Sequence, residues 1–179
     1  DLDAIPLDDS KTFELIRSTK TLGLFQIESP GQRELVGKFA PETFNDLIID
    51  ISLFRPGPVK SDMITPFLNA RQGWKARELF HGDLRGVLAE TEGVVVFHEQ
   101  VIHIISIMTG ISLAEADEKR RALSTPEGQQ EICDWFFPTA RARGYELRLV
   151  TEIWEVLRAF ASFGFCKAHA AAFALPTYQ

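Results

Sequence analysis

The chain has 179 residues, 45% of them hydrophobic, so it can bury one substantial core, and a single compact domain is the default expectation. It has no signal-peptide pattern, and no apolar run approaches the ~20 residues that a membrane-spanning helix needs. Its two cysteines, Cys133 and Cys166, are too few for a disulfide scaffold and do not have the spacing of metal ligands. A cytoplasmic protein without membrane contact is therefore expected. The net charge of −6 argues against bulk attraction to nucleic acid, so nucleotide binding must rest on a few placed cations.

Helix signals dominate the N-terminal part of the chain. Ser29 followed by Pro30 has the pattern of an N-cap and a first helical residue. Apolar residues recur at helical spacing after Pro41, which predicts a second helix. That helix must end at the FRPGP run, residues 54–58, because two prolines around a glycine cannot continue it. A further helix is predicted over residues 61–72.

The rest of the chain continues this pattern. Gly93 precedes VVVF, the one convincing strand-like run in the sequence. Ser112 and Glu115 have the spacing of a capping box, and Thr125 with Pro126 repeats the cap-then-proline signal. The sequence therefore predicts a mainly α, multi-helix domain with at most one or two short strands. The helices predicted here cover residues 84–88, 99–109, 112–123, 126–143 and 148–161, with a final helix that begins with residues 168–174.

The strongest candidate site is the run GFCKAHAAAFAL, residues 164–175. A glycine turn leads into an alanine-rich helix whose first turn carries Lys167, so a cation lies beside unpaired backbone N–H groups, which suits a phosphate. His169 lies about 200° around the helix from Lys167 and can border another part of a ligand, such as its sugar. The alternative is a small-residue helix packed in a core, with Lys167 directed to solvent.

A second cationic run is EADEKRRAL, residues 115–123. Lys119, Arg120 and Arg121 fan around the helix and cannot all pair with the acids one turn earlier, so at least one is available for a phosphate. A solvated face of ion pairs is an equal alternative. Arg55, held between prolines in FRPGP, is a further candidate contact, although Pro-Gly-Pro is also an ordinary way to end a helix.

Two patterns that resemble metal sites fail on geometry. HEQVIH, residues 98–103, is similar to the zinc motif HExxH, but its histidines lie about 140° apart on a helix. Asp8 and Asp9 fit a helix cap better than a magnesium site. We therefore expect no metal site and no catalytic residue in this chain.

Several runs in the same order resemble the fingers region of bacterial DNA polymerase III alpha subunits, which are C-family DNA polymerases. The resemblance implies a DNA-directed DNA polymerase in which aspartates of a palm domain, absent from this sequence, bind two Mg²⁺ ions. Residues 1–179 are then expected to be a fingers-region fragment of a larger chain, inactive alone, as a start at Asp1 also suggests. The runs are IPLDDSKTFELI, GLFQIES, FNDLIIDISLFRPGP, GVVVFHEQVIHI, EADEKRRAL and FASFGFCKAHAAAFALPTYQ.

The resemblance also implies roles for single residues. Arg120 and Arg121 match an arginine pair that holds the triphosphate of the incoming dNTP, and Lys167 matches a lysine in the same role. His169 matches a residue that presses on the sugar and disfavours a ribose 2′-hydroxyl. Phe163 matches an aromatic position beside the nucleotide, usually tyrosine.

The expected partners are the incoming dNTP and primer–template DNA, with a sliding clamp and other replication or repair proteins bound through regions not present here. The chain departs from replicative members at Cys166, Ala168, Ser124 and Thr125, where Asn, Ser and a basic pair are usual. These departures resemble the error-prone alpha subunits that serve translesion synthesis. The alternative function is a non-catalytic helical module that binds protein or nucleic acid on the same scaffold.

Overall fold

The computed structural model describes residues 2–54, 63–74, 80–161 and 164–179. Every regular element in these ranges is a helix, apart from one isolated parallel bridge between Phe97 and Phe165, so the mainly α prediction is confirmed. The strand-like run 94–97 makes no further strand pairing within these ranges. Its backbone has another partner, because the N–H groups of Val96 and Phe97 both donate to the side chain of Gln100.

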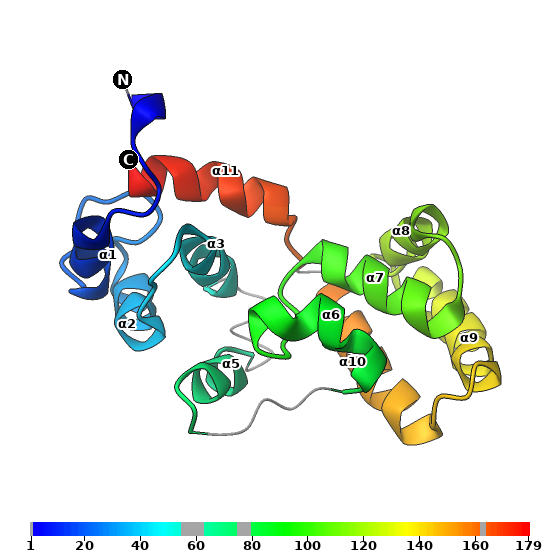
Figure 1. Ribbon diagram of the computed structural model, residues 1–179. Helices are drawn as coiled ribbons and strands as arrows, with labels where there is room; N and C mark the ends of the chain where they lie inside the picture. The colour runs from blue at the N-terminus through cyan, green and yellow to red at the C-terminus, as the bar shows by residue number, and fades with distance from the viewer. Residues whose placement is uncertain (1, 55–62, 75–79, 162–163) are drawn as a thin grey trace.

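The first group of helices is built around one apolar core (Figure 1). The last helix of the chain belongs to this group and packs along α3. Its Tyr178 hydroxyl donates to the Pro6 carbonyl and accepts from the Asp9 N–H, which ties the two ends of the chain together. The group consists of the 3₁₀ helix η1 (Leu2–Ala4) and of α1 (Ser10–Arg17), α2 (Pro30–Phe39), α3 (Phe44–Leu53), α5 (Ile64–Arg71) and α11 (Lys167–Tyr178).

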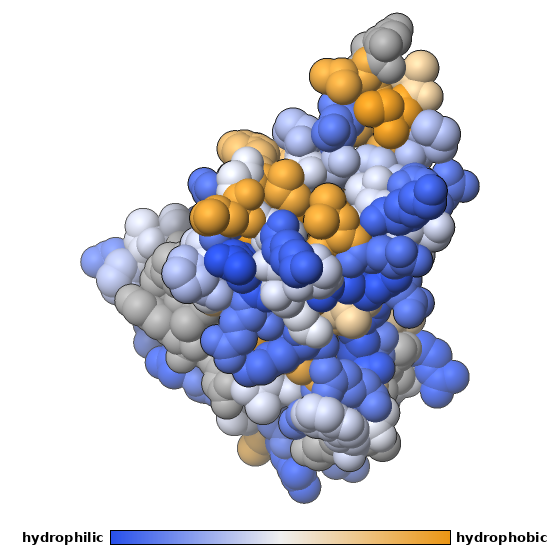
Figure 2. Space-filling model, turned by 90° about the vertical axis from the view of Figure 1, so that its left-hand side faces the viewer, coloured by the Kyte–Doolittle hydropathy of each residue, from blue (hydrophilic) through white to orange (hydrophobic). Residues whose placement is uncertain are grey.

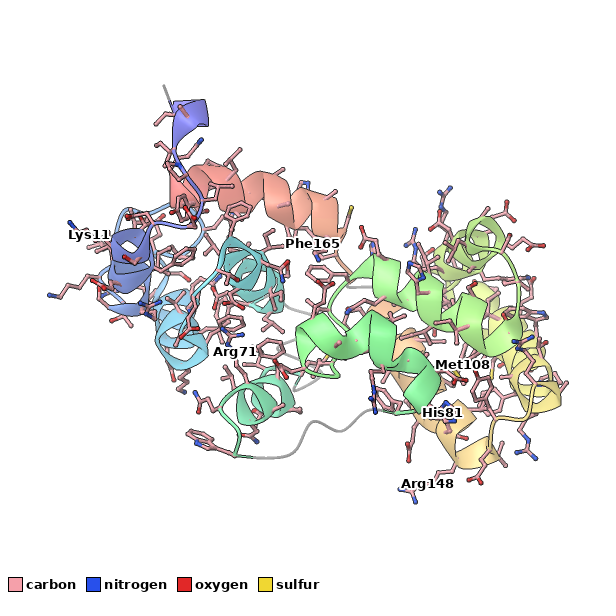
Figure 3. The ribbon with its side chains drawn as sticks, in the orientation of Figure 1. Lys11, Arg71, His81, Met108, Arg148 and Phe165 are labelled. Atoms are coloured by element: carbon pink, nitrogen blue, oxygen red, sulfur yellow. The ribbon has the colours of Figure 1, made fainter. Side chains whose placement is uncertain are left out.

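The second group surrounds a separate apolar core that contains Met108 (Figure 3). Its helices α7, α8 and α9 pack on one another, and α10 packs against α9. No helix in the described ranges is long and apolar enough to cross a membrane. The group consists of η2 (Gly82–Leu84), α6 (Arg85–Leu88), η3 (Ala89–Thr91), α7 (His98–Thr109), α8 (Leu113–Ala122), α9 (Pro126–Ala142) and α10 (Leu147–Ala161).

Several helix starts follow from local caps. The side chains of Ser29, Ser112 and Thr125 each accept a hydrogen bond from a backbone N–H in the first turn of the next helix, as predicted. The helix expected after Pro41 begins later, at Phe44, because Thr43 forms a capping box with Asp46. Helix α3 ends at Leu53, directly before the FRPGP run.

The chain passes between the two cores at residues 94–97 and again at 164–166. Val95 is buried in the second core, whereas Val96, Phe97 and Phe165 are buried in the first. Phe165 lies where α11 begins, beside α7 (Figure 3). The two crossings are joined by a hydrogen bond of 2.8 Å from the His98 N–H to the Phe165 carbonyl. The start of α11 is therefore held to the start of α7.

Some apolar side chains remain on the surface of the first group. Leu2 and Leu22 are 61% and 77% exposed. Apolar residues gather in the upper part of the face that carries α1, whereas the lower part of that face is mostly hydrophilic (Figure 2). Burial of apolar surface is therefore incomplete on this side of the molecule.

Asp50 is a buried carboxyl group without a hydrogen-bond partner among the described residues. Asp50 on α3 is fully buried, and neither of its oxygens accepts a hydrogen bond within the described part of the chain. Asp46, one turn earlier, forms an ion pair of 2.9 Å with Arg71, which lies between α2, α3 and α5 (Figure 3). Arg71 also donates to the Phe39 carbonyl and lies 4.4 Å over the Phe39 ring. Arg71 therefore forms its ion pair with Asp46.

The pKa values of the two carboxyl groups are shifted in opposite directions. Burial raises the pKa of Asp50 well above its usual range, against the attraction of Arg71, and the charge of Asp46 adds to the rise. Burial acts on Asp46 in the same direction. There, however, the hydrogen bond from the Glu42 N–H and the contacts with Arg71 outweigh it, so the pKa of Asp46 is lowered.

Replacing Asp50 should therefore change how stability depends on pH. A folded-state pKa above the unfolded value of about 3.9 means that unfolding free energy is lost as pH rises toward the folded pKa. Asp50→Asn removes this loss. The stability gained or lost on this substitution should therefore be more favourable to Asp50→Asn at pH 8 than at pH 5, when the free energies of unfolding of both proteins are measured in urea titrations.

Asp9→Asn is the matched control, because the lowered pKa of Asp9 keeps its carboxylate charged at both pH values and Asp9 is not among the groups that shift the pKa of Asp50. It should destabilise the protein by similar amounts at pH 5 and pH 8. Equal pH dependence in Asp50→Asn and the unsubstituted protein would show that Asp50 does not carry a raised pKa.

Candidate functional site

Two of the candidate cations, Lys167 and Arg120, lie near the first turn of α7. Lys167 opens α11, whose start is bound to α7, and Arg120 lies on α8, which packs against α7. Residues far apart in the sequence are thus brought to one region at the junction of the two cores (Figure 1).

The backbone at the start of α11 already binds an anion. The Lys167 N–H donates to both carboxylate oxygens of Glu99, at 3.1 Å each, and the Cys166 thiol donates to the same carboxylate at 3.2 Å. A carboxylate is favoured there because the N-terminus of a helix carries partial positive charge. The expectation of unpaired N–H groups beside Lys167 is therefore wrong for the Lys167 N–H itself.

The Lys167 side chain is also engaged. Its Nζ lies 2.6 Å from a carboxylate oxygen of Glu90, and the two side chains are 34% and 39% exposed. The same Nζ lies 5.6 Å from the centroid of the Phe97 ring, over its face. The alternative in which Lys167 is simply directed to solvent is therefore not what the structure shows. Its ammonium group is held in one place by an acid and a ring.

Gln100 fixes the segment that carries Glu90. Its Oε1 accepts from the N–H groups of Val96 and Phe97, at 2.7 and 3.0 Å. Its Nε2 donates to the Val87 carbonyl and to the Thr91 hydroxyl, at 3.1 and 2.8 Å. The side chain is only 4% exposed and uses its donor and acceptor positions fully, so η3 is held firmly against α7.

The arginines of α8 share one acid. Arg120 binds one carboxylate oxygen of Asp117 and Arg121 binds the other. Burial alone would raise the pKa of Asp117, but both arginines outweigh it and lower that pKa. The Arg120 side chain is 20% exposed and that of Arg121 is 71% exposed. Lys119 instead lies 5.0 Å over the Trp135 ring.

His98 links the start of α11 to α8. A side chain at Gly164 would place its Cβ 2.0 Å from the His98 ring, so the close approach requires glycine. Burial lowers the pKa of His98, and the neighbouring Arg120 lowers it further against the opposing charges of Glu99 and Asp117. Arg120 is thus an electrostatic neighbour of a ring that touches the turn into α11.

His169 is exposed on α11 and packs between two rings. Its ring centroid lies 5.1 Å from that of Phe165 and 4.4 Å from that of Phe173, both nearly perpendicular. The imidazole is therefore braced on two sides, although it is open to solvent. Phe163 and Arg55, the other candidate contacts, lie outside the described residues.

Three residues of this region were not singled out from the sequence, namely Glu90, Glu99 and Gln100. A signal for two of them exists, because Glu99 and Gln100 are polar residues in the first turn of a helix that is otherwise largely apolar. Nothing local marks Glu90, whose partner is 77 residues away. Asp9, in contrast, caps α1 as expected, and the described residues contain no group of three potential metal ligands.

Comparison with known proteins supplies the family. The family described as "Bacterial DNA polymerase III alpha subunit finger domain" matches residues 1–144. The chain is 40% identical to the DNA polymerase III subunit alpha of Campylobacter jejuni over 99% of its length, and 36% identical to that of Escherichia coli K12 over 100%. It is 37% identical to an error-prone DNA polymerase of Symbiobacterium thermophilum over 100%. It covers 15%, 16% and 17% of these relatives, respectively.

Removal of the Glu99 carboxylate should loosen the start of α11. Glu99→Ala leaves the Lys167 N–H without an acceptor and should lower the free energy of unfolding by about 1–2 kcal/mol, as for a lost helix cap. The Lys167 amide should then exchange its hydrogen faster. Glu99→Gln keeps one acceptor oxygen and should lose less. Unchanged exchange at Lys167 in Glu99→Ala would contradict the capping role.

Proposed function

Because the chain belongs to the finger-domain family of bacterial DNA polymerase III alpha subunits, as its sequence blocks predicted, we propose that it binds the incoming dNTP over primer–template DNA. The chain spans 15–17% of the relatives named above. In this proposal it is the fingers part of a longer DNA-directed DNA polymerase, and the chemical step takes place on residues outside it. A sliding clamp and other proteins would bind elsewhere on that longer protein.

The observation that carries the proposal is the convergence of Lys167 and Arg120 on the first turn of α7. The chain has a net charge of −6, so nucleotide binding must rest on a few placed cations such as these two. Each of these cations is held by a carboxylate, at Glu90 for Lys167 and at Asp117 for Arg120. A triphosphate carries more negative charge than one carboxylate and offers several acceptor oxygens, so it suits such a site.

His169 is suited to contact the sugar of the incoming nucleotide. It is exposed, lies two residues after Lys167, and is braced by Phe165 and Phe173. A ring that cannot easily move aside excludes an extra hydroxyl by contact, whereas a mobile side chain would yield. We assign to it the discrimination between deoxyribose and ribose.

The divalent metal of the reaction is assigned to another part of the longer protein. Two Mg²⁺ ions would activate the primer hydroxyl and stabilise the leaving pyrophosphate when bound. The described residues offer no group of three acidic, histidine or cysteine side chains to hold such an ion. The role of this chain is then to bind and orient the nucleotide.

The error-prone subtype stays a prediction. The identities to replicative and error-prone relatives, 36–40% and 37%, do not separate the two. Cys166 does take part in the site, since its thiol donates to Glu99. A thiol is a weaker donor than the amide of the asparagine usual in replicative members, so this departure affects the contact that holds α11.

Loss of a cation should weaken nucleotide use in the full-length protein. Lys167→Ala or Arg121→Ala should raise the KM for dNTP or lower kcat by about tenfold, the effect of one charge-assisted phosphate contact. Arg148→Ala is the matched control, because Arg148 is an 88% exposed arginine in a similar ion pair on α10. Steady-state kinetics that are unchanged in Lys167→Ala would refute the proposed site.

Shortening His169 should relax sugar selection. In the full-length protein, His169→Ala should lower the ratio of kcat/KM for dNTP to kcat/KM for rNTP by about tenfold, which is within the range of discrimination that one steric contact provides. His103→Ala, which removes an exposed histidine from α7, should leave the ratio unchanged. An unaltered ratio in His169→Ala would exclude the steric role.

A further inference from the structure

The ion pair between Lys167 and Glu90 joins two distant segments. Glu90 lies in η3 and Lys167 opens α11, 77 positions later in the sequence. Glu90 is also the acid that contacts the Lys167 ammonium, whereas Glu99 contacts its backbone. The two acids therefore act on different parts of the same residue.

The structure does not need this ion pair to hold α11. The start of α11 is already fixed by the carboxylate of Glu99, by the bridge between Phe97 and Phe165, and by the buried ring of Phe165. Gln100, in turn, holds η3 without any help from Glu90. The two side chains of this ion pair are about one-third exposed, so the pair contributes little to the free energy of folding. Its main effect should be on the binding of other anions to Lys167.

Any anion that uses Lys167 has to share its ammonium group with Glu90 or displace Glu90 from it. In either case the Glu90 carboxylate stays nearby, because Gln100 holds its backbone segment in place, and it repels the bound phosphates. The competition with Glu90 weakens the binding of every anion that uses this lysine, including the pyrophosphate left after nucleotide addition. When pyrophosphate begins to leave, the carboxylate can bind the ammonium again.

We propose that Glu90 competes with the phosphates of the incoming nucleotide for Lys167, and thereby limits nucleotide affinity and assists the release of pyrophosphate. This inference rests on the proposed function, because it takes Lys167 as a phosphate contact. It assigns Glu90 as an affinity-setting residue of the same site. Asp117 differs, because it binds arginines of its own helix at local spacing and orients them.

The test is Glu90→Gln in the full-length protein, which keeps the shape of the side chain and removes its charge. The KM for dNTP should fall about two- to fivefold, which is the range measured for exposed ion pairs. The inhibition constant for added pyrophosphate should fall by a similar factor. Glu131→Gln, which removes an exposed acid from α9, controls for the change in net charge and should alter neither constant.

A double substitution separates this inference from the function on which it rests. In a Lys167→Ala background, Glu90→Gln should lower both constants by less than it does alone, because the lysine for which it competes is gone and only its repulsion of the phosphates remains. If Lys167→Ala alone leaves the KM for dNTP unchanged, the proposed function fails. If Lys167→Ala raises that KM but Glu90→Gln leaves it unchanged or raises it, the competition by Glu90 is wrong and the function stands.

Discussion

The contact between Glu99 and the start of α11 is the constraint on which the rest of the site depends. Helix α11 buries its apolar face in the first core, yet its first residue is bound by a carboxylate from α7, which belongs to the second core. The bridge between Phe97 and Phe165 adds a second link at the same place. The position of Lys167 relative to α8 is therefore set where the two cores join.

Sequence patterns predicted the features whose causes are local. The caps at Ser29, Ser112 and Thr125 could be predicted because each acts within three residues of its own position. The run 94–97 was read as strand-like, since β-branched residues favour extended backbone. The sequence could not reveal that the Gln100 side chain accepts hydrogen bonds from the N–H groups of Val96 and Phe97, which a neighbouring strand would otherwise bind.

The candidate site also combines features that the sequence reveals with features that it does not. Its cations were found from the sequence because charge and helical spacing are visible there. Their partners were not, because Glu90 and Glu99 reach Lys167 across 77 and 68 residues. The physical logic of an anion at the start of α11 was sound, but a carboxylate of the protein occupies the place expected for a phosphate. In a chain with net charge −6, acids keep the cations in position.

The two arginines of α8 differ more than the family resemblance implies. Both bind Asp117, but Arg120 is largely buried and lies close enough to His98 to lower its pKa, whereas Arg121 is 71% exposed. A guanidinium that moves toward a ligand must leave its present contacts, and Arg120 would lose packing as well as an ion pair. Arg121 would lose only a solvent-exposed pair, which contributes little. In the proposed function, Arg121 can therefore extend to a phosphate at the lower cost, and Arg120 contributes its charge from its present position beside the turn into α11.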